Sequence, residues 1–128
     1  MRLLLDAHAL LWWLQDDDRL PSAVGDLIDD SGVPTTVSVV TLWELMVKSL
    51  RGRLRLPSSP ESIFADALDD AGFRVLAAER RHVLALPELP DIHGDPFDRM
   101  LVAQALVEDM TIVTGDQAIA QYPVPTIW

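Results

Sequence analysis

Short apolar runs alternate along the chain with longer segments whose apolar residues recur at helical spacing. Residues 2–6 (RLLLD) have the apolar triplet of a short buried strand, which ends in a carboxylate. The next segment places Leu10, Leu11 and Leu14 on one side of a helix. The same alternation continues through the remaining residues. The predicted strands are 2–6, 35–39, 73–76, 111–113 and 125–127, and the predicted helices are 7–15, 21–30, 40–50, 59–70, 79–86 and 97–108, the last of them amphipathic.

Strands that alternate with helices are typical of an α/β fold, because parallel strands need crossover connections. We expect one domain over residues 1–128, a three-layer α/β/α sandwich with a central, mostly parallel sheet of four to five short strands; 128 residues are too few for two cores. No apolar run reaches the roughly 20 residues of a membrane span. Asp6 and the acidic run 16–18 interrupt any signal-peptide pattern. These features predict a soluble, cytoplasmic protein without a membrane segment.

The charge of the chain restricts how it could bind nucleic acid. Lys+Arg 10 against Asp+Glu 20 gives a net charge of -10, so bulk electrostatic attraction to phosphates is excluded. A local basic patch or a bridging cation would be needed instead. Lys48, Arg51 and Arg53 form such a patch with Arg55, although a solubilising helix end would look the same. The absence of cysteine excludes disulfides, thiolate metal sites and a cysteine nucleophile.

Four carboxylates lie where parallel strands end or where helices begin, which is where α/β sheets bind ligands. Asp6 ends the first predicted strand and Asp116 follows the fourth, whereas Glu44 and Asp98 lie about one turn into helices. Each also has a structural explanation. Asp6 or Asp116 could cap a helix, and Glu44 or Asp98 could be the acid of a capping box, with Asp95 as the N-cap residue before Asp98.

Clustered carboxylates require a cation. Two bare carboxylates about 5 Å apart repel by roughly 3 kcal/mol at an effective dielectric constant near 20. Oxygen ligands without cysteine select a hard ion, which predicts Mg²⁺, with Mn²⁺ able to substitute. Such a site suits phosphoryl chemistry, because the ion binds a phosphate oxygen and lowers the pKa of an attacking water.

Several segments also carry a family resemblance. They are LLLDAHALLWWL at 3–14, SVVTLWELMVKSLRGRLRL at 38–56, HGDPFDRMLVAQALVEDMTIVTGD at 93–116 and YPVPTIW at 122–128. In this order they resemble the PIN-domain nucleases, and within them the VapC-type toxins of type II toxin–antitoxin systems. The resemblance implies a PIN-like fold and a metal-dependent endoribonuclease that cuts structured RNA such as tRNA or rRNA. It also implies an antitoxin partner and a homodimer.

Carried over by position, the resemblance implies catalytic roles for Asp6, Glu44, Asp98 and Asp116. Asp6, Asp98 and Asp116 would bind the metal, and Glu44 would orient or deprotonate the water. Thr114, Arg99, Lys48, Arg51 and Arg53 are expected as possible substrate contacts, and an ordinary surface role is equally open for Arg99.

Other features of the sequence leave alternatives open. Relatives commonly carry a hydroxyl residue after the first Asp, where this chain has Ala7, and a hydroxyl there would hold a metal-bound water. The three histidines are too scattered for a metal motif and are interpreted as structural. Trp12 and Trp13 are consecutive and cannot both enter one core, so one is expected on a dimer or antitoxin surface or at a core edge. Two other functions stay open: a catalytically weakened RNA- or protein-binding module, and a metal-dependent DNA nuclease.

Overall fold

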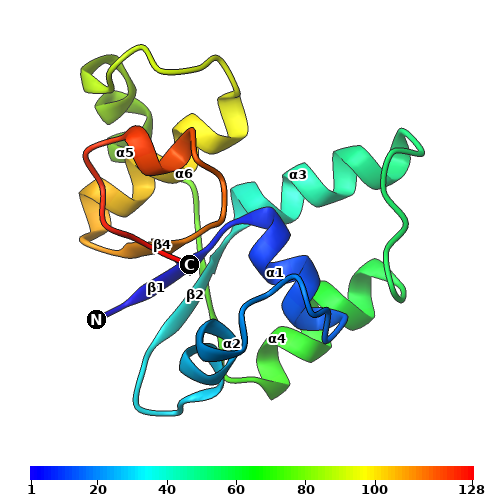
Figure 1. Ribbon diagram of the computed structural model, residues 1–128. Helices are drawn as coiled ribbons and strands as arrows, with labels where there is room; N and C mark the ends of the chain where they lie inside the picture. The colour runs from blue at the N-terminus through cyan, green and yellow to red at the C-terminus, as the bar shows by residue number, and fades with distance from the viewer.

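The protein is built around one five-stranded parallel sheet. A computed structural model describes all of residues 1–128. The strands lie in the order β3-β2-β1-β4-β5, and every neighbouring pair is parallel (Figure 1). The expected central parallel sheet is therefore confirmed, with no antiparallel edge. The strands are β1 (Leu3–Leu5), β2 (Thr35–Ser38), β3 (Arg74–Leu76), β4 (Thr111–Val113) and β5 (Thr126–Ile127).

Helices cover both faces of the sheet, as the three-layer prediction requires. Alternate residues of β1 point to opposite faces. Leu3 and Leu5 pack into a core with residues of α1 to α4, whereas Leu4 packs into a second core with residues of α6. The helices are α1 (Ala7–Leu14), α2 (Ser22–Asp29), α3 (Val39–Leu50), α4 (Ala67–Asp70), α5 (Arg80–Ala85) and α6 (Pro96–Glu108).

The strand order places a topological switch point between β1 and β4. From β1 the chain moves through β2 to one edge of the sheet, and it later returns to pair β4 with the other side of β1. In open α/β sheets, ligands bind at such a point beyond the carboxyl ends of the strands. The residues that follow β1 and β4 are therefore brought together by topology.

Two predicted helices differ from expectation. Helix α6 is not simply amphipathic, because five consecutive residues, 101–105, are buried. The cause is that α6 packs on the sheet with one side and contacts α5 and α3 with others. The segment predicted as one helix over 59–70 contains a π-helical turn, Ser62–Asp66, before α4. None of the helices combines the length and the apolar character needed to cross a membrane.

Candidate metal-dependent active site

Asp6 lies directly after β1, at the switch point. Its side chain is the N-cap of α1, and Oδ1 accepts a hydrogen bond of 2.8 Å from the Ala9 backbone N–H. The carboxyl is buried, and this burial raises its pKa above the usual range, while the Thr114 hydroxyl opposes the rise. Asp6 therefore does cap α1, as the structural alternative expected. Capping alone does not explain why its carboxyl is buried near other acids. Nearby Glu44 also raises the pKa of Asp6.

Asp98 occupies the first turn of α6. Asp95 is the N-cap residue and accepts a 3.0 Å hydrogen bond from the Asp98 backbone N–H, and Pro96 is the first helical residue. Burial raises the pKa of Asp98 to about 6, and the charges of Asp95, Glu44 and Asp116 add to the rise. The Asp98 side chain does not complete a capping box. Its Oδ2 instead lies 3.0 Å from His93 Nε2.

Glu44 projects from α3, the helix that follows β2, and it is buried. The N-cap of α3 is Ser38, six positions earlier, so the capping-box interpretation of Glu44 is wrong. Its carboxylate Oε2 lies 2.5 Å from Lys48 Nζ, one helical turn further along. Lys48 therefore neutralises part of the charge that Glu44 brings to the site.

Asp116 lies in the turn after β4 and is exposed. Its backbone N–H donates to Thr114 Oγ1 at 3.0 Å, and its Oδ1 accepts a 2.7 Å hydrogen bond from the Ala118 backbone N–H. The carboxylate thus stabilises its own turn, as the capping alternative expected, but a single 3₁₀ turn at Ile119–Gln121 replaces a full helix. Thr114 contacts both this turn and Asp6.

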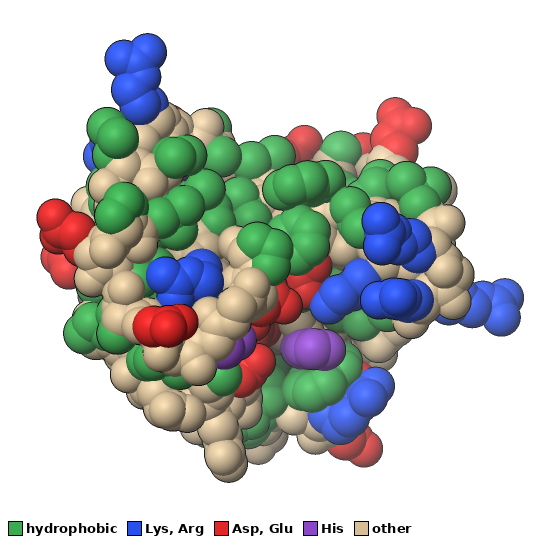
Figure 2. All heavy atoms as spheres, turned by 90° about the horizontal axis from the view of Figure 1, so that it is seen from above, with side chains coloured by type: hydrophobic (Ala, Val, Ile, Leu, Met, Phe, Trp, Pro, Cys, Tyr) green, Lys and Arg blue, Asp and Glu red, His purple; other side chains and the backbone are tan.

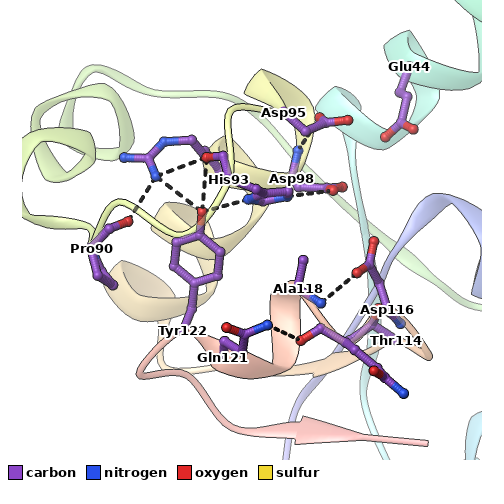
Figure 3. Close-up of polar contacts among 12 residues, drawn as sticks. Glu44, Pro90, His93, Asp95, Asp98, Thr114, Asp116, Ala118, Gln121 and Tyr122 are labelled. Atoms are coloured by element: carbon purple, nitrogen blue, oxygen red, sulfur yellow. Dashed lines mark hydrogen bonds and ion pairs between the residues drawn. The ribbon is translucent and has the colours of Figure 1, made fainter.

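The structure brings these four acids into one cluster. Glu44, Asp98 and Asp116 point toward a common space from α3, α6 and the turn after β4 (Figure 3). Asp98 is repelled by Glu44 and Asp116, and Asp6 is repelled by Glu44. Asp6 and Asp116 also line a single cavity. In the space-filling view, acidic side chains lie inside a hollow that is bordered by basic and hydrophobic side chains (Figure 2).

The donor atoms of this cluster fit a hard divalent cation. They are carboxylate oxygens without sulfur, and two of the carboxyls have raised pKa values because burial disfavours their charged forms. Lys48 is the only Lys or Arg that forms an ion pair with any of the four acids. A bound cation would supply the missing positive charge. Asp6, Asp98 and Asp116 are the candidate residues to hold it, since Glu44 is already partly neutralised by Lys48.

The basic residues expected to contact substrate lie at different places. Lys48 is bound to Glu44 at the site, and Arg51 and Arg53 are exposed at the end of α3. Arg99 does not pair with an acid. Its guanidinium donates to the Pro90 carbonyl at 3.0 Å and to the Tyr122 hydroxyl at 3.1 Å. We conclude that Arg99 fixes the loop before α6.

His93 is the site residue that sequence reasoning missed. The scattered spacing of the three histidines predicts only a structural role for it. The structure places its Nε2 against Asp98 and its Nδ1 2.7 Å from the Tyr122 hydroxyl (Figure 3). The available signal was its position five residues before Asp98, within the same motif. Tyr122 had no comparable signal in the sequence.

A second group of potential ligands lies between α5 and α6. Glu79, His82 and Glu108 place ligand atoms within 4.8 Å of one another. The Arg81 guanidinium, however, bonds to both carboxylates, and His82 Nδ1 accepts a 3.0 Å hydrogen bond from the Glu79 backbone N–H. These contacts satisfy the group without an ion. It is a structural network that joins the two helices.

Comparison with known proteins agrees with this geometry. Over residues 3–125 the chain matches the family described as PIN domain. Since the match spans nearly the whole sequence, the chain belongs to the PIN domain family. Within that family it is similar to proteins of the VapC type. One is Ribonuclease VapC22 of Mycobacterium tuberculosis (strain ATCC 25618 / H37Rv), which is 26% identical over 132 residues, covering 98% of this chain and 98% of the relative.

Solved structures share the fold at lower identity. VapBC2 from Rickettsia felis, bound to a DNA fragment from the promoter, matches with a TM-score of 0.73 and 14% identity, over 99% of this chain and 98% of that chain. VapBC-1 from nontypeable Haemophilus influenzae matches with a TM-score of 0.66 and 18% identity, over 99% of this chain and 97% of that chain. At these identities the likeness shows the fold alone.

Proposed function

We propose that the protein is a metal-dependent endoribonuclease that acts as the toxin of a toxin–antitoxin pair. The observation that carries the proposal is the convergence of Asp6, Glu44, Asp98 and Asp116 from four separate segments, with a single lysine to balance them. Four acids at a switch point are costly for stability unless a cation binds there. Similarity to a protein named a ribonuclease adds support.

In this proposal each residue has a distinct task. Asp6, Asp98 and Asp116 would hold Mg²⁺, or Mn²⁺ in its place. When bound, such an ion supplies Lewis acidity and lowers the pKa of a coordinated water. Glu44 would orient that water and accept its proton, and Lys48, 2.5 Å from Glu44, would hold the Glu44 carboxylate in place. The Thr114 hydroxyl contacts both the Asp6 carboxyl and the backbone of the Asp116 turn, so it holds the two in a fixed relative position.

The proposed substrate is structured RNA such as tRNA or rRNA. The chemistry at phosphorus would be the same on DNA. A preference for the 2′-hydroxyl is the property that would separate an RNase from a DNase. Matched RNA and DNA oligonucleotides of one sequence test this preference directly. Faster cleavage of the DNA would favour the alternative that the protein is a DNA nuclease.

The proposed partners are an antitoxin and a second copy of the chain. Solved relatives include VapBC assemblies, which supports a protein partner here. An apolar groove of about 460 Å³ runs between α3 and α6, and its residues include Val39, Trp43, Phe97 and Met100. Trp43 is 61% exposed in the single chain, which is costly for so large an apolar ring unless a partner covers it. Light scattering of wild type and Trp43→Glu tests whether this face forms the homodimer.

The proposed activity is tested by cleavage of total cellular RNA with Mg²⁺, Mn²⁺ or EDTA. Wild type should cut in either metal and not in EDTA, and Asp98→Asn should lose at least a hundredfold in rate because a metal-binding carboxylate is gone. Asp69→Asn is the matched control, since this exposed acid on α4 lies outside the cluster. Cleavage that survives in EDTA or in Asp98→Asn would refute the mechanism. RNA binding that is independent of metal and without cleavage would instead support the binding-module alternative.

A further inference from the structure

An aromatic cavity adjoins the acid cluster. Its volume is about 420 Å³, which lies within the range of small-molecule sites. Asp6 and Asp116 form part of its wall, so the cavity opens directly onto the carboxylates. The other wall is aromatic and basic, and it consists of His8, Trp12, Arg19 and Trp128. The metal chemistry proposed above uses none of these four side chains.

The aromatic wall is built from two segments that are far apart in sequence. The rings of Trp12 and Trp128 lie 5.8 Å apart, centroid to centroid, and are inclined by 52°. His8, one turn before Trp12 on α1, lies 5.4 Å from the same ring. Trp128 is nevertheless 42% exposed. The arrangement therefore holds an open indole surface rather than a closed core.

Gly115 makes room for this surface. A Cβ atom at position 115 would lie 2.6 Å from the Trp128 ring, which is closer than real contacts allow. The absence of a side chain lets the indole lie against the turn that carries Asp116. Trp128 is thus positioned beside the candidate metal ligand by direct contact with the preceding residue.

Arg19 adds a positive charge to the same wall. Its guanidinium carbon lies 4.7 Å from the Trp12 ring centroid, and an ion pair of 2.7 Å with Asp17 holds it there. One face of Trp12 is therefore already covered by a cation, which leaves Trp128 as the open stacking surface. Arg19 retains N–H donors for a nearby phosphate.

We propose that this cavity is a base-binding subsite in which the nucleotide next to the scissile phosphate stacks on Trp128, with Trp12 as the supporting wall. The inference rests on the proposed nuclease function and specifies how substrate is held. Every base offers a π face, and stacking on aromatic side chains is the common way in which proteins hold unpaired bases. Because the chain carries a net charge of -10, base stacking supplies affinity that phosphate attraction alone does not.

The test measures binding in an inactive Asp98→Asn background with Mg²⁺ present. The probes are the RNA decamer A10 and a ribose–phosphate decamer without bases, and the readouts are anisotropy of labelled RNA and tryptophan fluorescence. We expect A10 to bind more tightly and to quench fluorescence. Trp128→Leu should weaken A10 about tenfold and leave the abasic decamer unchanged, and Trp128→Phe should restore most of the loss.

Two further variants keep the test decisive. Gly115→Ala should displace the indole and weaken A10 in the same direction. Trp13→Phe is the control, because Trp13 packs against Phe73 outside the cavity and should leave the A10 preference unchanged. Thermal melting checks that each variant is folded.

The outcomes separate this inference from the proposed function. Equal binding of A10 and the abasic decamer, or equal A10 binding by Trp128→Leu and its parent, overturns the subsite even if wild type cleaves RNA. An A10 preference that depends on Trp128 supports the subsite, and absence of metal-dependent cleavage by wild type would then refute only the nuclease.

Discussion

His93 Nε2 lies 3.0 Å from Asp98 Oδ2, and this contact fixes the orientation of a residue proposed to bind metal. The tautomer of His93 follows from its other partner. The Tyr122 hydroxyl accepts a 3.1 Å hydrogen bond from Arg99, and its own proton is better placed for His93 Nδ1, 2.7 Å away, than for the His93 carbonyl at 3.5 Å. Nε2 then carries the proton and donates to Asp98. Arg99 therefore acts on the acid cluster through two intermediate side chains.

Replacement of His93 by alanine should move the pH dependence of metal binding upward. The hydrogen bond from His93 lowers the pKa of Asp98, which burial has raised to about 6. Without that bond the pKa rises further, so a higher pH is needed to free the carboxylate for the ion. Calorimetric titration with Mn²⁺ between pH 5 and 8 measures the midpoint. Tyr122→Phe should shift it less, and an unchanged midpoint in His93→Ala would contradict the prediction.

Without metal, the free energy of unfolding should fall as pH rises from about 4 to about 6. Asp98 has a pKa of about 6 in the folded protein against an ordinary value of 3.8, so the folded state holds more protons in this window and loses that advantage as pH rises. Asp98→Asn should weaken the dependence, because Asp6, whose pKa is also raised by burial, still contributes to it. The variant should raise metal-free stability at pH 7 by about 1 kcal/mol, discounted for solvent screening. Mg²⁺ should stabilise wild type at pH 7.5 more than at pH 5.5. Urea unfolding of both proteins, with Asp69→Asn as control, measures these effects.

The exposed arginines after α3 should contribute salt-dependent affinity for RNA. If Arg51 and Arg53 each contact one phosphate, the double variant Arg51→Ala/Arg53→Ala should reduce the slope of log K against log salt by about 1.4 for a single strand. Anisotropy titrations of Asp98→Asn in 50 to 200 mM salt provide the slope. The double variant Arg74→Ala/Arg80→Ala is a matched control with the same charge change, because both residues are exposed on β3 and α5. Equal slopes for the two double variants would show that the patch is only a solubilising surface.

A buried hydrogen bond between β2 and α6 should contribute to the free energy of unfolding and have little effect on the rate of RNA cleavage. Ser38 Oγ donates to Gln104 Oε1 at 2.5 Å, and both residues are fully buried. Gln104→Leu leaves the Ser38 hydroxyl without this acceptor, which should cost about 1–3 kcal/mol of unfolding free energy. The rate of RNA cleavage at 25 °C should stay within twofold of wild type. Gln121→Leu, at an exposed position, should change stability much less in the same urea titration.

The fold could be predicted because its strands are short apolar runs between strong helical patterns. β1 is three leucines because it is the central strand and is buried on both faces, so its sequence shows no alternation. Asp6 and Asp116 could be placed because the carboxyl ends of β1 and β4 meet at one edge of the sheet, and Glu44 and Asp98 because each lies near the start of a helix. The N-cap roles of Asp6 and Asp95 could also be predicted, since each hydrogen bond reaches only three residues along the chain.

The parts that could not be predicted depend on contacts between distant segments. The pairing of His93 with Tyr122 spans 29 residues, and the tilted ring contact between Trp12 and Trp128 spans nearly the whole chain. The hydrogen-bond partners of Arg99 could not be predicted for the same reason, because they are the Pro90 carbonyl in a loop and the distant Tyr122 hydroxyl. By contrast, the Lys48–Glu44 pair could have been read from its i, i+4 spacing, which favours an ion pair over a free phosphate contact.

The central place of β1 also sets an order of events during synthesis. β1 pairs with β4 in the register Leu3 to Thr111. β1 is synthesised long before β4, so this part of the sheet cannot form until β4 has been made. At about 5–20 residues per second, Asp6 and Asp116 leave the ribosome roughly 5 to 20 seconds apart. Such long-range parallel pairing also folds slowly. A nascent chain therefore carries no assembled acid cluster, and the ribosome that makes the protein is not exposed to the folded site until β4 has emerged.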